Sequence, residues 1–565
     1  MWLIAINTGH NGSTALYKDS ELIFYIEEDR LSRWKYDGNP YLGLEKAYEY
    51  TDHVDYLMLC GTRNAFGLMP WTREDPYSCY VRKKQKGIKF ETKLYGDDHH
   101  LTHATTGFYN SGFNEAAVIV VDGAGSGLDI PEWTEVMQQT WEVESIYSMS
   151  YPAEVQCHLK YYGTNLTDSF NLTDNDTYIE VSDSHGLTKT YEAVTGFLGF
   201  HAIEAGKTMG LAPYGKFNEN IKINEDRFTN RSFIKPGFPA GSVIRADLDE
   251  DLKRTMGDTS WHKDETKIDQ YRKDLAYMVQ KSTEDRVKLL IKTAVEITGK
   301  KNIVISGGYG LNCVANYEFL KEFPDLTFYN EPIAHDGGNV IGACQYVYRT
   351  ISKDSKKTPL TSLYLGPENK DQYDNIDYEG FTVTDSTTQE VAKLIADETI
   401  VCMYQGRSEA GPRALGNRSI LFDPTVKNGK DIVNEVKHRE WFRPFAGTVL
   451  AEKASEWFDL RSKKETPFMM YAVNVVEDKL DIIPAITHVD GTCRVQTVTK
   501  EQNKNYYELI EEFEKLKGVP ILFNTSFNLG GDPLVETMSE ALDTLRRSDL
   551  KYLWLPEIGK LVVKD

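Results

Sequence analysis

Three of the twelve histidines lie in the stretch DDHHLTH. A helix over residues 98–112, with the Asp98 carboxylate as its N-cap, would put its apolar side chains on one face. His99 and His103 would then project together from the opposite face, at the spacing by which one helix supplies two imidazole ligands to a metal ion. His100 points elsewhere on such a helix, so we expect it to be structural. A solvated helix face is the alternative, because two ligands alone do not hold a metal.

Two aspartates could complete such a site. Asp122 follows the apolar run AAVIVV and directly precedes a glycine turn, at the end of a strand where active-site groups of α/β sheets collect. Asp336 lies in HDGGN, before paired glycines and a helix-like run. Two imidazoles with one or two carboxylates suit Fe(II), Mn(II) or Zn(II), and the spacing does not choose among these metals. The sequence therefore predicts a metal site made of His99, His103, Asp122 and Asp336.

A further histidine, His10, lies in the glycine-flanked turn TGHNG between two apolar runs. An imidazole in such a loop can act as a base, an acid or a phosphate donor near neutral pH. An ordinary turn residue is the equal alternative.

Residues 405–445 form a basic stretch in an acidic chain, with eight Lys and Arg against five Asp and Glu. Several of these arginines flank glycine or proline, which indicates rigid loops, and guanidinium groups bind phosphates and acyl phosphates through paired charge-assisted hydrogen bonds. The basic residues of interest are Arg407, Arg413, Arg418, Lys437, Arg439 and Arg443. Further along, Arg494 and a polar turn with Asn524, Ser526 and Asn528 follow. This composition predicts an anion pocket, and a set of surface salt bridges is the alternative.

Length and composition narrow the class of protein. A chain of 565 residues is too long for one hydrophobic core, so we expect at least two domains. Seven widely spaced cysteines without a CxxC motif argue against a disulfide framework and fit a reducing cytosol. The absence of a basic leader and of a run of about 20 apolar residues predicts a cytoplasmic protein away from membranes. The formal charge of −21 disfavours a large nucleic-acid footprint, although a local basic pocket can still bind a small anion.

The pattern along the chain predicts an α/β architecture. Apolar runs separated by Gly, Asn and Asp clusters predict strand, turn, strand, turn, strand near the N-terminus. Strand-to-glycine units recur at AAVIVVDG and at KNIVISGGYG, where backbone N–H groups could meet phosphates, although each glycine run taken singly is weak evidence and an ordinary turn is the alternative. The polar segment 356–372, with two prolines, predicts a linker between a first domain of residues 1–355 and a second of residues 373–565.

Nine blocks follow one another along the chain: HxxxH, a strand ending VDG, GKTMGLAPYG, SGGYGLNCVAN, HDGGNVIGA, GPRALGNRSI, FRPFA, HVDGTCRVQ and NTSFN. Together they resemble the NodU-type O-carbamoyltransferases, the family of the nodulation-factor, tobramycin and ansamycin carbamoyltransferases, over essentially the whole chain. The resemblance implies that the first domain has an actin/Hsp70-like ATPase-superfamily fold related to the TsaD-like proteins. It implies that the second is a YrdC-like α/β domain.

By this resemblance, the second domain would form carbamoyl-adenylate from carbamoyl phosphate and ATP with Mg²⁺, and the first would pass the carbamoyl group to an acceptor hydroxyl. The four predicted metal ligands match the family's metal site, which typically holds Fe²⁺. His10 matches a histidine near the acceptor, with Asn11 after it where relatives often have Asp. Gly307, Gly308 and Asn312 match the turn near the adenylate. The resemblance assigns to ATP and carbamoyl phosphate Arg413, Arg418, Lys437, Arg443, Arg494, Ser526 and Asn528. The candidate catalytic residues are His10, Lys437 and Arg443.

The acceptor stays open among a sugar, a natural product and a hydroxymethyl-pyrimidine nucleotide. Hydroxymethylated bases of phage DNA and a threonylcarbamoyl-type modification of tRNA are alternatives, which the negative charge disfavours. A small-molecule kinase would share the first fold without needing HxxxH or a basic second domain. A nucleotide sensor without catalysis is the binding-module alternative, and a homodimer is left open.

Overall fold

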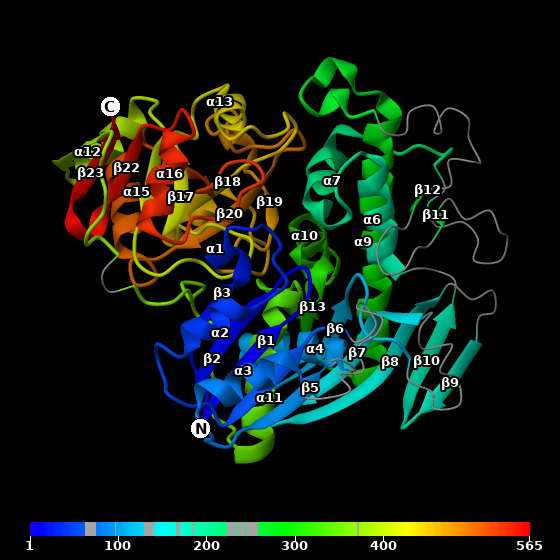
Figure 1. Cartoon of the computed structure of the whole chain (residues 1–565). Helices are drawn as coiled ribbons and strands as arrows, with labels where there is room; N and C mark the ends of the chain where they lie inside the picture. The colour runs from blue at the N-terminus through cyan, green and yellow to red at the C-terminus, as the bar shows by residue number, and fades with distance from the viewer. Residues whose placement is uncertain are drawn as a thin grey trace. The chain divides into compact units, whose positions relative to one another are not determined.

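Figure 1 shows a computed structural model of the chain, in which the residues described are 1–62, 75–95, 98–128, 140–164, 170–182, 186–221, 223, 234–235, 243–244, 258–369 and 372–565. The chain forms two compact units. The first unit comprises Met1–Glu28 and Tyr36–Leu360, and the second comprises Asp29–Lys35 and Thr361–Asp565. The division after Leu360 falls inside the predicted linker, whereas the membership of residues 29–35 in the second unit was not predicted.

One sheet of the first unit is built from the N-terminal strands. Its order is β3-β2-β1-β4-β5, with β1 antiparallel to β2 and parallel to β4. The strands are β1 (Trp2–Asn7), β2 (Ser13–Lys18), β3 (Glu21–Glu27), β4 (Tyr56–Cys60) and β5 (Glu91–Tyr95). The predicted succession of three strands and two tight turns at the N-terminus is therefore confirmed. The turn between β1 and β2 carries His10.

The other large sheet of the first unit has the order β14-β13-β6-β7-β8-β10-β9. Its strands are β6 (Glu115–Val121), β7 (Thr140–Ser150), β8 (Glu154–Thr164), β9 (Phe170–Asp174), β10 (Thr177–Ser182), β13 (Asn302–Ser306) and β14 (Thr327–Asn330). Strand β13 runs parallel to β6, so the carboxyl ends of these two buried strands meet at one edge of the sheet. That edge carries Asp122 after β6 and Gly307 after β13.

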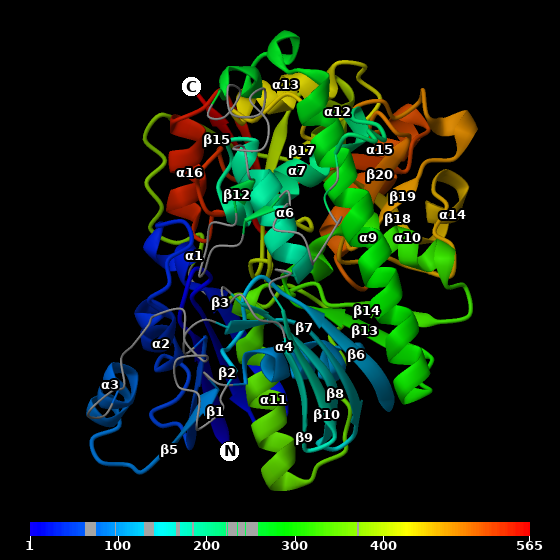
Figure 2. The same cartoon turned by 90° about the vertical axis from the view of Figure 1, so that its right-hand side faces the viewer.

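Two helices pack against each other between these sheets (Figure 2). Helix α4 (His99–Ser111) lies on β6 and β13, and helix α11 (Asn339–Ser352) lies on β1, β2 and β4. Gly342 permits their close approach, because a Cβ at this position would lie 2.4 Å from the backbone nitrogen of Thr106. The other helices of the first unit are α2 (Tyr41–Ala47), α3 (Pro76–Lys84), α6 (Gly186–Phe197), α7 (Ala205–Leu211), α9 (Gln270–Thr298) and α10 (Cys313–Glu322). A short pair of strands, β11 (Ile234–Lys235) and β12 (Val243–Ile244), also belongs to this unit.

The second unit is built on a sheet of order β15-β23-β22-β16-β17-β21-β18-β20-β19. Its strands are β15 (Phe381–Asp385), β16 (Val401–Tyr404), β17 (Arg418–Phe422), β18 (Ala446–Leu450), β19 (Ala472–Asn474), β20 (Thr492–Val498), β21 (Ile521–Ser526), β22 (Tyr552–Leu555) and β23 (Lys560–Lys564). Its helices are α12 (Thr388–Ala396), α13 (Gly429–Val436), α14 (Ala454–Trp457), α15 (Lys504–Lys517) and α16 (Met538–Arg546), while α1 (Glu28–Ser32) begins at the end of the first unit's opening segment. Both units mix helices with strands, so the predicted α/β class is confirmed. Within the described ranges, no helix has the length and apolar content of a membrane-spanning segment.

Candidate metal centre and candidate anion site

The structure brings the four predicted metal ligands of the first unit together. The Nε2 atoms of His99 and His103, one turn apart on α4, lie 3.1 Å from each other. His99 Nε2 lies 3.5 Å from an oxygen of Asp122 and 3.6 Å from one of Asp336, and the corresponding distances for His103 are 3.9 and 3.5 Å. All four ligand atoms lie within 4.8 Å of one another.

One feature of the prediction for this helix is wrong, and the alternative to the metal site is excluded. Asp98 occupies the N-cap position of α4, but its side chain makes no capping hydrogen bond. The alternative of a solvated helix face also fails, because His99 and His103 are at most 1% exposed. The reason is the position of α4 between a sheet and α11, which buries the polar face as well as the apolar one.

Hydrogen bonds hold Asp122 in place, and a short turn carries Asp336. The N–H of Gly308 donates to Asp122 Oδ1 at 3.0 Å, and Thr188 Oγ1 donates to the carbonyl oxygen of Asp122. Gly307 makes this approach possible, since it has φ +82° and a Cβ there would lie 2.4 Å from the carbonyl oxygen of Val121. Asp336 lies in a short 3-10 turn (Asp336–Gly338) before α11.

Electrostatics at the cluster favour charged groups despite burial. Burial disfavours a charge on His99, but the carboxylates of Asp336 and Asp122 raise its pKa well above the ordinary value. Burial and the neighbouring Asp336 oppose ionisation of Asp122, yet the two imidazoles lower its pKa. Burial likewise opposes ionisation of Asp336, and His99 and His10 lower its pKa well below the ordinary value.

The geometry fits a transition-metal ion. Metal–nitrogen distances of about 2.0–2.1 Å place two ligand atoms of one ion roughly 3 Å apart, which is close to the separations found here. Two imidazoles and two carboxylates are a donor set for Fe(II), Mn(II) or Zn(II), as the sequence indicates. His10 lies beside this donor set, with its Nε2 3.8 Å from Asp336 Oδ2 and half of its side chain exposed.

The turn after β13 holds the other residues predicted for the first unit. Gly308 contacts Asp122 as described above, and Asn312 caps α10 by accepting a hydrogen bond from the N–H of Ala315 at 3.0 Å. The amides of Asn312 and Gln280 also exchange two hydrogen bonds of 3.1 Å. Asn312 therefore has a structural role in the fold beside the adenylate-binding role predicted for it.

An ion pair between a buried glutamate and a partly buried lysine, which the sequence does not predict, supports the metal cluster. Glu142 on β7 pairs with Lys160 on β8, and its Oε2 accepts hydrogen bonds from the N–H groups of His100 and Ser126. Burial opposes ionisation of Glu142, but Lys160 lowers its pKa to about 2. His100 is structural as predicted: its Nδ1 lies 2.7 Å from Ser145 Oγ, and burial lowers its pKa to about 4. The pairing across β7 and β8 is a long-range contact for which the sequence carries no local signal.

In the second unit, Lys437 forms the centre of a polar group. Its Nζ donates to the carbonyl oxygen of Ser526, and lies 3.4 Å from Ser526 Oγ and 3.3 Å from Asn528 Oδ1. Ser526 ends β21, and Lys437 follows α13 directly. Burial and the charges of Arg439 and Arg443 lower the pKa of Lys437 well below its ordinary value.

Arg439 and Arg443 act on the charge of this lysine, and two further arginines act on that of Arg439. Burial and the charges of Arg443, Arg494 and Arg413 lower the pKa of Arg439, although Glu440 opposes this effect. Arg443 pairs with Glu440 at 3.3 Å, and Arg494 lies on β20. Like charges held together at a partly desolvated site define a candidate anion site. Arg439 is one of the basic residues from which the sequence predicts an anion pocket, but the family resemblance does not assign it to ATP or carbamoyl phosphate.

Arg418 differs from the other predicted arginines. It is 2% exposed, its guanidinium stacks 3.8 Å from the centre of the Tyr404 ring, and its NH groups donate to several main-chain carbonyl oxygens, among them those of Gly406 and Glu536. These contacts fix the loop before β17. Its role at the anion site stays a prediction, and the structure gives it a positioning role.

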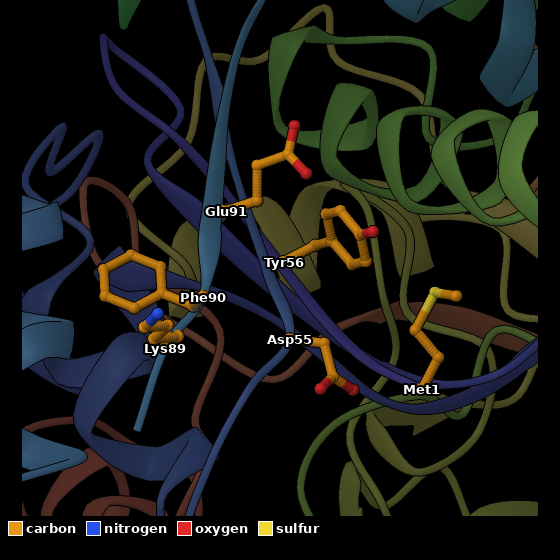
Figure 3. Close-up of a pocket in the computed structure, with 6 residues that line it drawn as sticks. All are labelled: Met1, Asp55, Tyr56, Lys89, Phe90 and Glu91. Atoms are coloured by element: carbon orange, nitrogen blue, oxygen red, sulfur yellow. The ribbon is translucent and has the colours of Figure 1, made fainter. Parts of the chain in front are cut away.

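A surface pocket of about 470 Å³ also lies in the first unit (Figure 3). It is lined by Met1, Asp55, Tyr56, Lys89, Phe90 and Glu91. None of the predicted site residues lines it.

Fold and site thus define a two-unit α/β protein with a histidine–aspartate cluster in one unit and a lysine–arginine cluster in the other. Residues 71–345 match the family model described as carbamoyltransferase N-terminus, and residues 392–563 match that described as carbamoyltransferase C-terminus. Nodulation protein NolNO of Sinorhizobium fredii is 30% identical over 98% of this chain and 79% of its own length. Nodulation protein NolO of Bradyrhizobium diazoefficiens is 31% identical over 81% of this chain and 77% of its own length.

The chain belongs to the carbamoyltransferase family, which confirms the predicted resemblance. It is an enzyme that transfers a carbamoyl group from a donor to a hydroxyl-bearing acceptor. Among solved structures, HypF in a phosphate- and nucleotide-bound form is similar over 62% of this chain and 56% of its own, at 11% identity and a TM-score of 0.36.

Proposed function

We propose that the protein is an ATP-dependent O-carbamoyltransferase that acts in two steps, one in each unit. Carbamoyl phosphate, ATP and water would first give carbamoyl-adenylate, pyrophosphate and phosphate. The acceptor hydroxyl would then take the carbamoyl group and release AMP. The two domain types expected from the family, TsaD-like and YrdC-like, would carry the second and the first step respectively.

In the first step, a carbamate oxygen would form a bond to the α-phosphorus of ATP while the bond to pyrophosphate breaks. Bringing these polyanions together requires fixed positive charge, because the reacting groups repel one another. Lys437, Arg439, Arg443, Arg494 and Arg413 supply that charge, and Ser526 and Asn528 hold Lys437 in place. Mg²⁺ would accompany the nucleotide.

In the second step, the acceptor oxygen would form a bond to the carbamoyl carbon, and AMP would leave with the electron pair of the broken bond. The hydroxyl proton needs a base, and His10 is a candidate because its half-exposed imidazole lies 3.8 Å from Asp336. The N–H of Gly308 and the glycine turn after β13 are candidate contacts for the adenylate.

The same unit would hold a divalent metal, Fe²⁺ by the family resemblance, on His99, His103, Asp122 and Asp336. Such an ion would polarise a carbonyl or phosphoryl oxygen of the reacting group. The protein's own part is to hold the four ligands in one buried cluster, through the backbone contacts of Asp122 and the packing of α4 on α11.

The proposed acceptor is a small hydroxyl compound: a sugar, a natural product or a hydroxymethyl-pyrimidine nucleotide. The charge of −21 disfavours phage DNA and tRNA, because affinity for a nucleic acid comes mainly from neutralising its phosphates.

One observation carries the proposal. The first unit gathers histidines and carboxylates, the ligands of a cation, whereas the second gathers a buried lysine and partly buried arginines, the ligands of an anion. A two-step carbamoyl transfer through an adenylate needs both kinds of site.

The test is to incubate the protein with ATP, labelled carbamoyl phosphate and a panel of hydroxylated acceptors. We expect AMP together with a labelled carbamate ester when a suitable acceptor is present. Formation of ADP and a phosphorylated acceptor would instead favour a kinase, and no consumption of ATP with any acceptor would favour a nucleotide sensor.

A further inference from the structure

A short segment from the N-terminal part of the chain belongs to the second unit. Residues Asp29–Lys35 cluster with Thr361–Asp565, although the residues on both sides of this segment belong to the first unit. The segment lies outside both matched family regions, which cover residues 71–345 and 392–563. Its side chains contact the loops that carry residues of the candidate anion site.

Arg30 holds the loop that carries Arg413. This arginine is 6% exposed, and its NH1 and NH2 groups donate to the carbonyl oxygens of Glu409 at 3.3 Å and Gly411 at 3.0 Å. Arg413 follows Gly411 by two residues. Two hydrogen bonds from one planar guanidinium fix the direction of the backbone at this point.

The carboxylate of Glu409 closes the same loop from the other side. Its Oε1 accepts hydrogen bonds from the N–H groups of Leu415, Asn417 and Arg418, at 2.8, 2.8 and 3.1 Å. The main chain of Glu409 is therefore held by Arg30 while its side chain holds the residues after Arg413. Removal of Arg30 would release the start of the loop but leave its end in place.

Arg33 makes a second link from the same segment. It donates to the carbonyl oxygens of Leu534 at 2.7 Å and Pro533 at 3.0 Å. The residue before Pro533, Asp532, accepts a hydrogen bond of 2.7 Å from the amide of Asn528 through its carbonyl oxygen. Asn528 in turn contacts Lys437, so Arg33 supports the polar turn next to that lysine.

Lys35, at the end of the segment, adds positive charge to the same site. The pKa of Lys437 is lowered by burial, by Arg439 and Arg443 and, to a smaller extent, by Lys35. Because the Lys35 charge interacts with Lys437, it would also attract an anion bound beside Lys437.

We propose that the segment Asp29–Lys35 completes the anion site of the second unit, with Arg30 and Arg33 as positioning residues for Arg413 and Asn528. The inference rests on the proposed function only for the identity of the anions, ATP and carbamoyl phosphate. It means that residues from the start of the chain control the formation of carbamoyl-adenylate.

The test compares Arg30→Ala with Arg546→Ala in the full chain. Arg546 is a matched control, because it also donates to two main-chain carbonyl oxygens of the second unit, those of Asp377 and Glu379, but it supports no residue of the anion site.

Pyrophosphate binding is measured by calorimetry, and pyrophosphate release from ATP is measured against carbamoyl phosphate concentration. We expect Arg30→Ala to weaken pyrophosphate binding and to raise KM for carbamoyl phosphate, each about tenfold or more, with partial rescue by added guanidinium. Arg546→Ala should change neither.

The results separate this inference from the proposed function. If the unaltered protein binds neither pyrophosphate nor ATP, the proposed function of the second unit fails. If it binds them and Arg30→Ala behaves like Arg546→Ala, the role of the segment is wrong. Should Arg30→Ala not fold, Arg30→Lys, which keeps the charge but not the planar pair of donors, is measured instead. A raised KM for Arg30→Lys supports the inference, and an unchanged KM overturns it.

Discussion

The histidine–aspartate cluster of the first unit and the lysine–arginine cluster of the second are assembled differently. The former takes its four ligands from α4, from the end of β6 and from the turn before α11, segments separated by up to about 230 residues and fixed by packing between two sheets. In the latter, Lys437, Arg439 and Arg443 come from one turn after α13, and Arg413, Arg494 and Ser526 from loops and strands around it.

The two clusters also differ in the sign of the ion that each could bind. In the first, imidazoles and carboxylates converge on one point, and an ion placed there would have four ligands. In the second, burial and mutual repulsion lower the pKa values of Lys437 and Arg439, and a bound anion would relieve that repulsion. This difference indicates that the chain has a candidate cation site in the first unit and a candidate anion site in the second. The following predictions test whether the two sites act separately.

The largest effect is expected for His103→Ala. Loss of one of four ligands should remove the bound metal and reduce carbamoyl transfer by more than about 100-fold. Loss of a residue that only hydrogen-bonds to a metal ligand already costs up to about 100-fold, so loss of a ligand should cost more. Metal content by elemental analysis and formation of labelled product measure the two effects. His53→Ala is the control, because His53 lies at the surface beside Asp52. Full metal content with full transfer in His103→Ala would refute the role of the cluster.

A smaller effect is expected for Arg494→Ala. Removing one preorganised cation from the anion site should lower carbamoyl-phosphate-dependent pyrophosphate release by about 100-fold. The metal content should not change, since Arg494 belongs to the other unit. Arg461→Ala, which removes an exposed arginine paired with Asp459, is the matched control. Equal activity of the two variants would exclude Arg494 from the site.

The third prediction concerns stability. Glu142→Gln leaves the partly buried Lys160 without its partner and should lower the free energy of unfolding by about 3 kcal/mol, the lower end for a broken buried pair, as measured by urea denaturation. The double variant Glu142→Gln/Lys160→Met should recover much of this loss, because it removes both charges. A double variant less stable than Glu142→Gln would contradict the pairing.

The pH dependence of this effect has a definite sign. The pKa of Glu142 is lowered from 4.5 to about 2, so its ionisation stabilises the fold fully above about pH 4.5 and progressively less as the pH falls toward 2. The difference in unfolding free energy between the unaltered protein and Glu142→Gln should therefore shrink between pH 5 and pH 3.

Local patterns predicted much of the fold and of both sites. The spacing of His99 and His103, and the positions of Asp122 and Asp336 before glycine turns, were enough to propose one cluster, because strand ends and helix faces follow general geometric rules. The hairpins at the N-terminus and the strand before Gly307 followed from apolar runs and turn residues. The family itself followed from nine blocks in order.

Long-range packing accounts for what the sequence could not predict. The burial of α4 depends on α11, which follows it by more than 200 residues. The alternation of apolar and polar residues along α4 therefore left a solvent-exposed polar face open as an alternative, although that face is buried. The Glu142–Lys160 pair depends on the register of β7 against β8. The membership of Arg30 in the second unit depends on contacts with residues 409 and 411, for which a segment of seven residues carries no signal.

One measurement tests most directly whether each unit carries out one of the two steps. Exchange of labelled pyrophosphate into ATP is measured for His103→Ala and Arg494→Ala in parallel, with carbamoyl phosphate present and no acceptor. The account predicts that His103→Ala exchanges pyrophosphate at nearly the rate of the unaltered protein, whereas Arg494→Ala exchanges almost none. Loss of exchange in His103→Ala together with its retention in Arg494→Ala would contradict the assignment of the two steps to the two units.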